Sequence, residues 1–140
     1  MAEPDIAFTT LNTNGSERFQ SLRRELGVTS FGMNLAILAP RQRGRIHAHE
    51  HQEEVYLVLE GELTLGVEGV EHTVARGGLV RVAPGVRRQL VNRGTTALQL
   101  LALGGAGEHV GRDGKAWESW DEDGDGRAPQ DVALPADLPV

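Results

Sequence analysis

Three of the five histidines fall within five residues, and a glutamate follows them closely. These residues are His47, His49, His51 and Glu54. Because side chains alternate across a β-strand, His47 and His49 on one strand point two imidazoles toward the same face. Two imidazoles on one face, with a carboxylate nearby, are typical ligands of a divalent transition metal. The spacing therefore predicts a metal site in this segment.

On one continuous strand, Glu54 would point to the opposite face from His47 and His49. The chain must therefore bend between residues 50 and 53 for its carboxylate to join the two imidazoles. The five residues after Glu54 (VYLVL) are apolar on both faces and predict a buried strand. A carboxylate at the start of such a strand is partly desolvated and requires a partner, which a metal ion or an arginine would provide. His51 shares the alternation of the two histidines, but the same bend tends to turn it outward.

The segments that must position these side chains are short β-strands. From residue 33 to residue 103, apolar runs alternate with turn signals rich in glycine and proline, spaced about 8–12 residues apart. No helical periodicity interrupts them, which excludes a parallel sheet built from βαβ units. The pattern predicts an all-β domain, either an antiparallel sandwich or a small barrel, with strands near residues 35–39, 55–59, 63–67, 70–74, 79–82, 90–92 and 98–103.

The predicted domain covers residues 33–105 and is preceded by an N-terminal extension of residues 1–32. Within this extension, residues 16–26 favour a short helix, with Ser16 as its N-cap and Gly27 as its stop. The alternative is a loop that packs its three apolar residues on the domain.

The net charge of −6 comes entirely from the end of the chain. Residues 1–112 contain 12 acidic and 12 basic residues, whereas residues 113–140 contain eight acidic residues against Lys115 and Arg127. We therefore expect residues 106–140 to form an acidic, flexible tail. A neutral body with an acidic tail lacks the basic surface that nucleic acids and anionic membranes require, so neither is an expected partner.

The composition narrows the class of protein further. A chain of 140 residues with 39% hydrophobic residues is the size of a single globular domain. It has no cysteine, which excludes disulfides, thiolate catalysis and iron–sulfur clusters. No run of residues is apolar enough to span a membrane, and the N-terminus does not resemble a signal peptide. The expected location is the cytoplasm.

The histidine-rich segment resembles a known family motif. Residues 47–62, HAHEHQEEVYLVLEGE, contain the pattern His-x-His-x4-Glu-x6-Gly. This pattern is similar to the first motif of the cupins, in which two histidines and a glutamate bind a metal ion inside a small β-barrel. A partial second motif follows in residues 77–92, where the family pattern is Gly-x5-Pro-x-Gly-x2-His-x3-Asn. Here Arg88 stands in the position of the histidine ligand, and Ala83 in that of the proline.

The resemblance covers roughly residues 33–103 and implies a cupin-type small β-barrel, also called a jelly roll or double-stranded β-helix. It also implies a divalent transition metal, and two imidazoles with a carboxylate suit Fe, Mn, Ni or Zn about equally. A metal-dependent oxygenase, isomerase or decarboxylase acting on a small organic acid is the enzymatic expectation. Cupins of this size commonly pair, which implies a homodimer. Residues 28–39, Trp117 and Trp120 are candidates for that interface.

Arg88 leaves three hypotheses open, because a guanidinium stays protonated and cannot bind a metal. In the first, His47, His49 and Glu54 suffice as metal ligands, and Arg88 binds an anionic substrate. In the second, His51 replaces the missing ligand. In the third there is no metal: Arg88 pairs with Glu54 inside the domain, which then binds or senses a small molecule without catalysis.

Two further residues are candidates for ligand binding. Tyr56 has the same alternation as Glu54, so its ring is expected to line the interior, either as packing or as a hydroxyl offered to a ligand. Gln99 is a polar residue within a predicted strand, which places it either toward the cavity or at a sheet edge.

Overall fold

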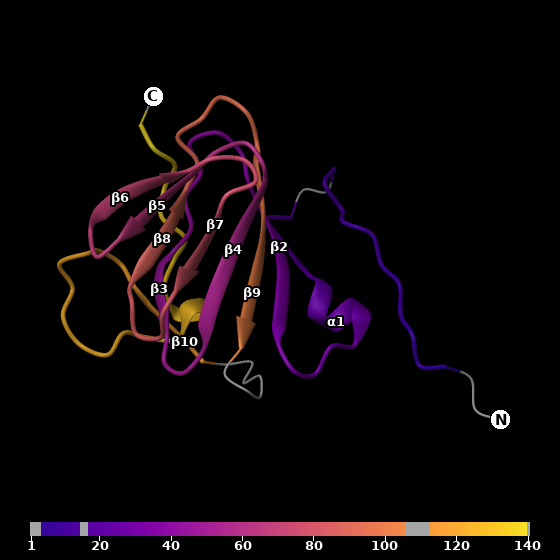
Figure 1. Ribbon diagram of the computed structural model, residues 1–140. Helices are drawn as coiled ribbons and strands as arrows, with labels where there is room; N and C mark the ends of the chain where they lie inside the picture. The colour runs from indigo at the N-terminus through magenta and orange to yellow at the C-terminus, as the bar shows by residue number, and fades with distance from the viewer. Residues whose placement is uncertain (1–3, 15–16, 106–112, 140) are drawn as a thin grey trace.

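Alternating apolar residues in the central segment build two antiparallel sheets that face each other (Figure 1). The computed structural model describes residues 4–14, 17–105 and 113–139. The first sheet contains, in spatial order, β1 (Phe19–Ser21), β2 (Gly32–Leu38), β9 (Leu98–Gly105), β4 (Glu53–Glu60) and β7 (Leu79–Val82). The second contains β10 (Gly114–Trp117), β3 (Ile46–His49), β8 (Arg88–Val91), β5 (Leu63–Val67) and β6 (Val70–Val74).

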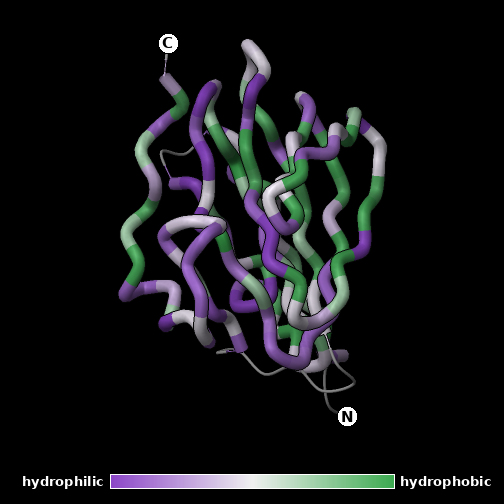
Figure 2. The backbone as a smooth tube through the Cα atoms, turned by 90° about the vertical axis from the view of Figure 1, so that its left-hand side faces the viewer, coloured by the Kyte–Doolittle hydropathy of each residue, from purple (hydrophilic) through white to green (hydrophobic). Residues whose placement is uncertain are grey.

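The main core lies between the two sheets. Every second residue of the strands points inward, and these residues are almost all aliphatic. Figure 2 shows hydrophobic residues concentrated in the strands and hydrophilic residues in most of the loops. The all-β prediction is confirmed, although the sheets are not closed into a barrel in the described part of the chain. The buried residues of this core are Ala36, Leu38, Tyr56, Val58, Leu63, Leu65, Val82, Leu90, Leu98, Leu100 and Ala102.

The predicted N-terminal helix exists but is shorter than expected. Helix α1 (Leu22–Leu26) is capped by Ser21, whose hydroxyl accepts a hydrogen bond from the Arg24 backbone N–H at 3.3 Å. Gly27 ends the helix with a φ of 75°, as predicted. The helix starts late because the residues before it form β1 and pair with β2. Ser16 lies outside the described residues.

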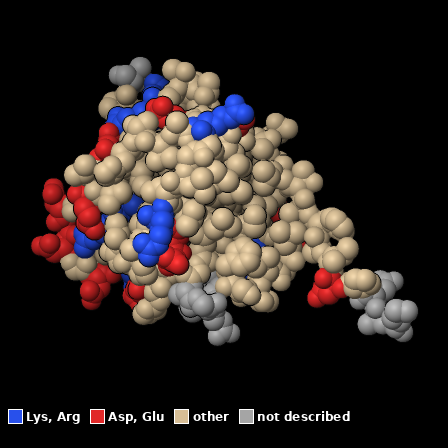
Figure 3. Space-filling model, viewed as in Figure 1, with Lys and Arg blue, Asp and Glu red and all other residues tan. Residues whose placement is uncertain are grey.

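The segment expected to form a flexible tail contains regular structure in its described part, residues 113–139. Strand β10 pairs with β3, and Trp117 packs with Trp120 against Ile46 on the outer side of that strand. Further along, the short 3-10 helix η1 (Pro129–Asp131) is followed by the buried Val132. Apart from the buried Asp113, the acidic residues of this segment lie at or near the surface, and Figure 3 shows acidic side chains gathered on the left of the molecule, where this segment lies in Figure 1. Its few apolar residues anchor it to the fold.

Arginine side chains hold the last described residues against the domain. Arg45 donates to the Val132 carbonyl at 2.6 Å, and Arg43 donates to the Ala136 carbonyl at 2.7 Å. These bonds explain why a segment with little hydrophobic character stays attached. Among the described residues, no helix is both long and apolar enough to cross a membrane.

Candidate metal centre

Strand β3 presents both histidines to the interior. Ile46 and Ala48 alternate with them and are buried against the tryptophans on the outer side, so His47 and His49 must point the other way. Their rings lie 5.5 Å apart between centroids in an edge-to-face arrangement. The register of the second sheet places His47 directly opposite Arg88 of β8.

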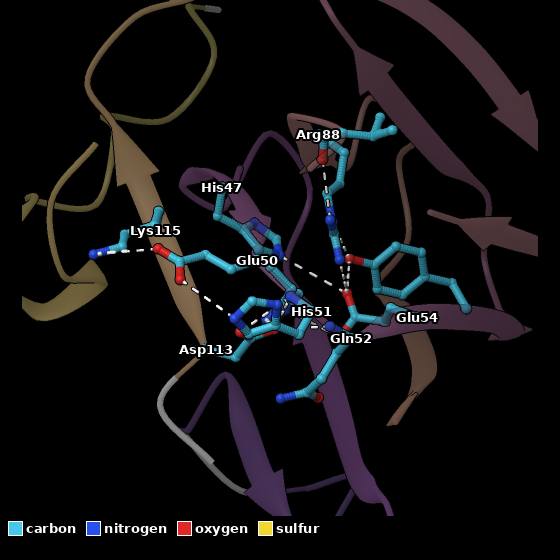
Figure 4. Close-up of polar contacts among 11 residues, drawn as sticks. His47, Glu50, His51, Gln52, Glu54, Arg88, Asp113 and Lys115 are labelled. Carbon is cyan, nitrogen blue, oxygen red and sulfur yellow. Dashed lines mark hydrogen bonds and ion pairs between the residues drawn. The ribbon is translucent and has the colours of Figure 1, made fainter. Parts of the chain in front are cut away.

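The chain bends after β3, as the sequence requires, and brings Glu54 back to the histidines. The Asp113 carboxylate accepts hydrogen bonds from the backbone N–H groups of His51 and Gln52, each at 2.9 Å. Strand β4 then starts in the opposite sheet, and Glu54 faces β3 across the interior (Figure 4). Glu54 Oε2 lies 3.5 Å from His49 Nε2, and Glu54 Oε1 lies 3.9 Å from His47 Nε2.

Arg88 is fully buried, and its guanidinium is occupied by the protein itself. One terminal nitrogen donates to Glu54 Oε1 at 2.8 Å, and the other donates to the Val86 carbonyl at 3.0 Å. The remaining nitrogen, Nε, donates to the Tyr56 hydroxyl at 3.2 Å, and that hydroxyl donates to the same Glu54 Oε1. The expectation that Arg88 binds a substrate anion stays a prediction, and in this structure its guanidinium contacts Glu54, Tyr56 and the Val86 carbonyl.

The charges in this group fix the protonation of its members. Burial alone would raise the pKa of Glu54, but the imidazoles of His47 and His49 and the charge of Arg88 hold it well below 4.5. Burial, together with the negative charge of Glu54, raises the pKa of the Tyr56 hydroxyl far above its usual value. Glu54 is therefore an anion at neutral pH, and Tyr56 is a permanent hydrogen-bond donor to it.

The donor set fits a divalent metal ion. One donor atom from each of His47, His49 and Glu54 lies within 4.8 Å of the other two. His47 Nδ1 lies 3.1 Å from the Arg45 carbonyl, which can only accept, so this nitrogen donates to it and Nε2 is the ring nitrogen that faces Glu54. Glu54 Oε1 is held by Arg88, whereas Oε2 faces His49. A metal would therefore be held by two Nε2 atoms and Glu54 Oε2.

Two of the predicted site residues do not join this group. The side chain of His51 is 72% exposed and lies 3.8 Å from Glu50, so it cannot supply the missing ligand. His51 and Glu50 do lie near Asp113, but the Asp113 carboxylate is already bonded to two backbone N–H groups. Gln99 alternates with Leu98 and Leu100, which are in the core, so its side chain is on the outer face of the first sheet.

Two cavities of different character adjoin the group, and His49 lines both. The apolar cavity, of about 160 Å³, also contacts His47 and is walled by Phe19, Leu38, Leu90, Pro129 and Leu134. The polar cavity, of about 250 Å³, contacts Glu54 instead and is lined by Arg23, Arg24, Asn34 and Gln52, among others. The group of His47, His49 and Glu54 thus lies at the boundary between them.

Sequence reasoning missed Asp113, Arg23 and Arg24. Asp113 is the first of the acidic residues assigned to the tail, and its role depends on a contact with residues 51 and 52. The two arginines lie in the N-terminal helix, which no sequence pattern places beside Glu54. Only the helix itself was detectable, from its apolar spacing and its glycine stop.

A family model described as a cupin domain matches residues 34–104. This match covers about half of the chain and extends from β2 into β9, so the protein belongs to the cupin family. The resemblance noted in the sequence is therefore confirmed. The comparison with curated proteins gave no significant match.

Solved structures show the same fold with different described activities. A sugar phosphate isomerase of the cupin superfamily from Silicibacter pomeroyi is 30% identical, with a TM-score of 0.59 over 62% of this chain and 57% of that one. A predicted oxalate decarboxylase from Thermotoga maritima is 25% identical, with a TM-score of 0.51 over 54% and 65%. This chain thus spans less than two thirds of the length of either protein.

A third structure matches almost end to end. A cupin protein from Bacteroides fragilis has a TM-score of 0.68 over 88% of this chain and 99% of that one. At 15% identity this similarity shows the fold alone.

Proposed function

We propose that this protein is a metal-dependent cupin that binds a divalent transition metal through His47, His49 and Glu54, and a small organic anion beside it. The observation that carries this proposal is the orientation of His47. Its Nδ1 donates to the Arg45 carbonyl, so Nε2 is the nitrogen presented toward Glu54. One donor atom from each of His47, His49 and Glu54 lies within 4.8 Å of the other two, which a single metal ion requires of its ligands.

The ligand class is supported by what the two similar enzymes are described as acting on. Sugar phosphates and oxalate are both small organic anions, although the named reactions differ. A bound divalent metal would supply Lewis-acid stabilisation of a negatively charged oxygen on such a ligand. Arg88 and Tyr56 keep Glu54 ionised and fixed, and the apolar wall beside His47 excludes water from that side. The shared fold does not determine which reaction follows.

The alternative function is a metal-free cupin that binds a small molecule without catalysis. The observation in its favour is the Arg88–Glu54 ion pair at 2.8 Å, because a guanidinium already neutralises the carboxylate. In that case the histidines would be ordinary polar lining of a binding pocket.

Calorimetric titration of chelator-treated protein with Zn²⁺ or Mn²⁺ tests the two functions against each other. We expect one ion per chain for the wild type and loss of binding in His47→Ala and His49→Ala. The control is His72→Ala, which alters an exposed histidine on β6 and should bind as the wild type does. Absence of binding in the wild type would exclude the metal-dependent function and favour the alternative.

A further inference from the structure

The polar cavity beside Glu54 has a positively charged wall on the side of helix α1. Both Arg23 and Arg24 line it, and His49 and Glu54 lie at its inner end. We propose that Arg23 and Arg24 bind the oxyanion group of a small organic anion, whose other end reaches the metal centre at His49 and Glu54. This inference rests on the proposed function and names the residues that recognise its ligand.

The charge balance of the cavity favours an anion. Glu54 is the one acidic residue among the described residues that line it, and Arg88 neutralises that carboxylate from behind. The charges of Arg23 and Arg24 are therefore not compensated within the cavity. Within the described ranges neither arginine forms an ion pair, in contrast to others such as Arg81 and Arg93, which pair with glutamates.

Arg23 also has a hydrogen-bond donor that no described group satisfies. Its Nε atom is buried and has no partner within the described part of the chain. A buried donor without an acceptor costs free energy, and an oxyanion in the adjacent cavity would supply that acceptor. Guanidinium groups bind carboxylate and phosphate oxygens in pairs, which suits a donor of this kind.

The element that carries the two arginines is firmly attached. Leu22 is buried against the first sheet, Ser21 caps the start of α1, and Gly27 closes its end. A recognition group on such an element is held in place before the ligand arrives, which lowers the entropic cost of binding.

Small residues keep the cavity open between the arginines and Glu54. Gly32, Ala102 and Gly104 contribute its wall from β2 and β9. A Cβ atom added at Gly104 would lie 3.0 Å from Gln52 Oε1 and 3.9 Å from Glu54 Oε2. The space in front of Glu54 therefore depends on the absence of a side chain there, and about 250 Å³ accommodates a small anion.

The test is a calorimetric titration of metal-loaded protein with three probes: ribose 5-phosphate, oxalate and, as the neutral probe, ribose. We expect at least one anion to bind and ribose to bind weakly. Arg23→Gln and Arg24→Gln should each weaken anion binding by roughly 10- to 100-fold. The control Arg76→Gln, at an exposed site that pairs with Glu60, should change nothing. The preferred anion distinguishes a phosphate from a carboxylate ligand.

The outcomes separate this inference from the proposed function. The inference is wrong if neither anion binds to protein that holds one metal ion per chain. It is also wrong if both arginine variants bind the anion as the wild type does. In either case the proposed metal site is unaffected. If the arginine variants lose anion binding in protein that never takes up metal, the inference stands and the metal-dependent function fails. Far-ultraviolet circular dichroism of each variant verifies that α1 and the sheets remain folded.

Discussion

Two acidic side chains lie within the centre, and the protein stabilises their charges in different ways. Glu54 is held by a guanidinium and a phenol on one oxygen, while its other oxygen faces His49. Asp113 accepts hydrogen bonds from the backbone N–H groups of His51 and Gln52 and lies 4.0 Å from His49 Nδ1, and its side chain is 1% exposed. Asp113 is thus fully engaged in shaping the bend, whereas Glu54 keeps one oxygen free to act as a ligand.

This difference shows how a cupin can retain a carboxylate ligand after losing the histidine of its second motif. Arg88 occupies that position and binds the far oxygen of Glu54, so it orients the carboxylate without competing for Oε2. Its positive charge still opposes a bound dication, which should weaken metal affinity relative to a site with a third histidine as the fourth ligand. Four substitutions test this difference between the environments of Glu54 and Asp113.

The largest expected effect comes from Arg88→Ala. Removing the guanidinium leaves Glu54 buried and ionised without its main partner, and this should lower the free energy of unfolding by about 3–5 kcal/mol in metal-free protein. Urea denaturation monitored by tryptophan fluorescence measures the loss. Adding Glu54→Gln to the variant should recover part of it. A loss below about 1 kcal/mol would mean that the ion pair contributes little.

Asp113→Ala should have the next largest effect. The substitution removes the acceptor for the backbone N–H groups of His51 and the buried Gln52 at the bend, which should lower the free energy of unfolding by about 2–3 kcal/mol. Because Glu54 follows that bend, metal affinity should fall as well. Thermal and urea denaturation report the first change, and Zn²⁺ titration reports the second. The exposed Asp121 provides the control, since Asp121→Ala should alter neither quantity.

Tyr56→Phe tests how much the phenol hydroxyl stabilises the Glu54 carboxylate, a contribution that we expect to be smaller than that of Arg88. It removes the hydroxyl that donates to Glu54 Oε1 and accepts from Arg88, but it leaves the ion pair in place. We expect a loss of about 1–2 kcal/mol in the free energy of unfolding, measured by urea denaturation. A loss as large as that of Arg88→Ala would show that the phenol, rather than the guanidinium, holds the carboxylate.

Arg88→His should strengthen metal binding while weakening the metal-free protein. The new imidazole lies opposite His47 on β8 and removes a positive charge from the site. We expect Zn²⁺ to bind about tenfold more tightly, which corresponds to about 1.4 kcal/mol. Competition with a chromogenic chelator measures the affinity. Unchanged or weaker binding would show that Arg88 does not occupy the position of a metal ligand.

The fold and the grouping of His47, His49 and Glu54 were predictable because they depend on local patterns. Alternating apolar residues identify strands wherever one face is buried, and the two-residue spacing places His47 and His49 on one face. Even the bend before Glu54 follows from its alternation. The Arg88–Glu54 pair was part of the metal-free hypothesis, and no local pattern shows that it forms while His49 faces the other oxygen of Glu54.

The remaining parts depend on contacts between residues distant in sequence. Strand β10 has only four residues, and it pairs with β3 at an edge that its own composition does not predict. Gln99 is placed outside the core by the alternation of Leu98 and Leu100, which fixes its face once the strand register is known. Arg23 and Arg24 face the centre because α1 packs on β2, and no local pattern contains that information.

The central claim is that one carboxylate oxygen of Glu54 accepts a hydrogen bond from Arg88 and the other binds a metal ion. A crystal structure of Zn²⁺-loaded protein, with anomalous data collected at the zinc absorption edge, tests it directly. We predict an anomalous peak within about 2.0–2.2 Å of His47 Nε2, His49 Nε2 and Glu54 Oε2, with Arg88 still bonded to Oε1. No peak at this position, or a peak bound through the exposed His51, would contradict the account.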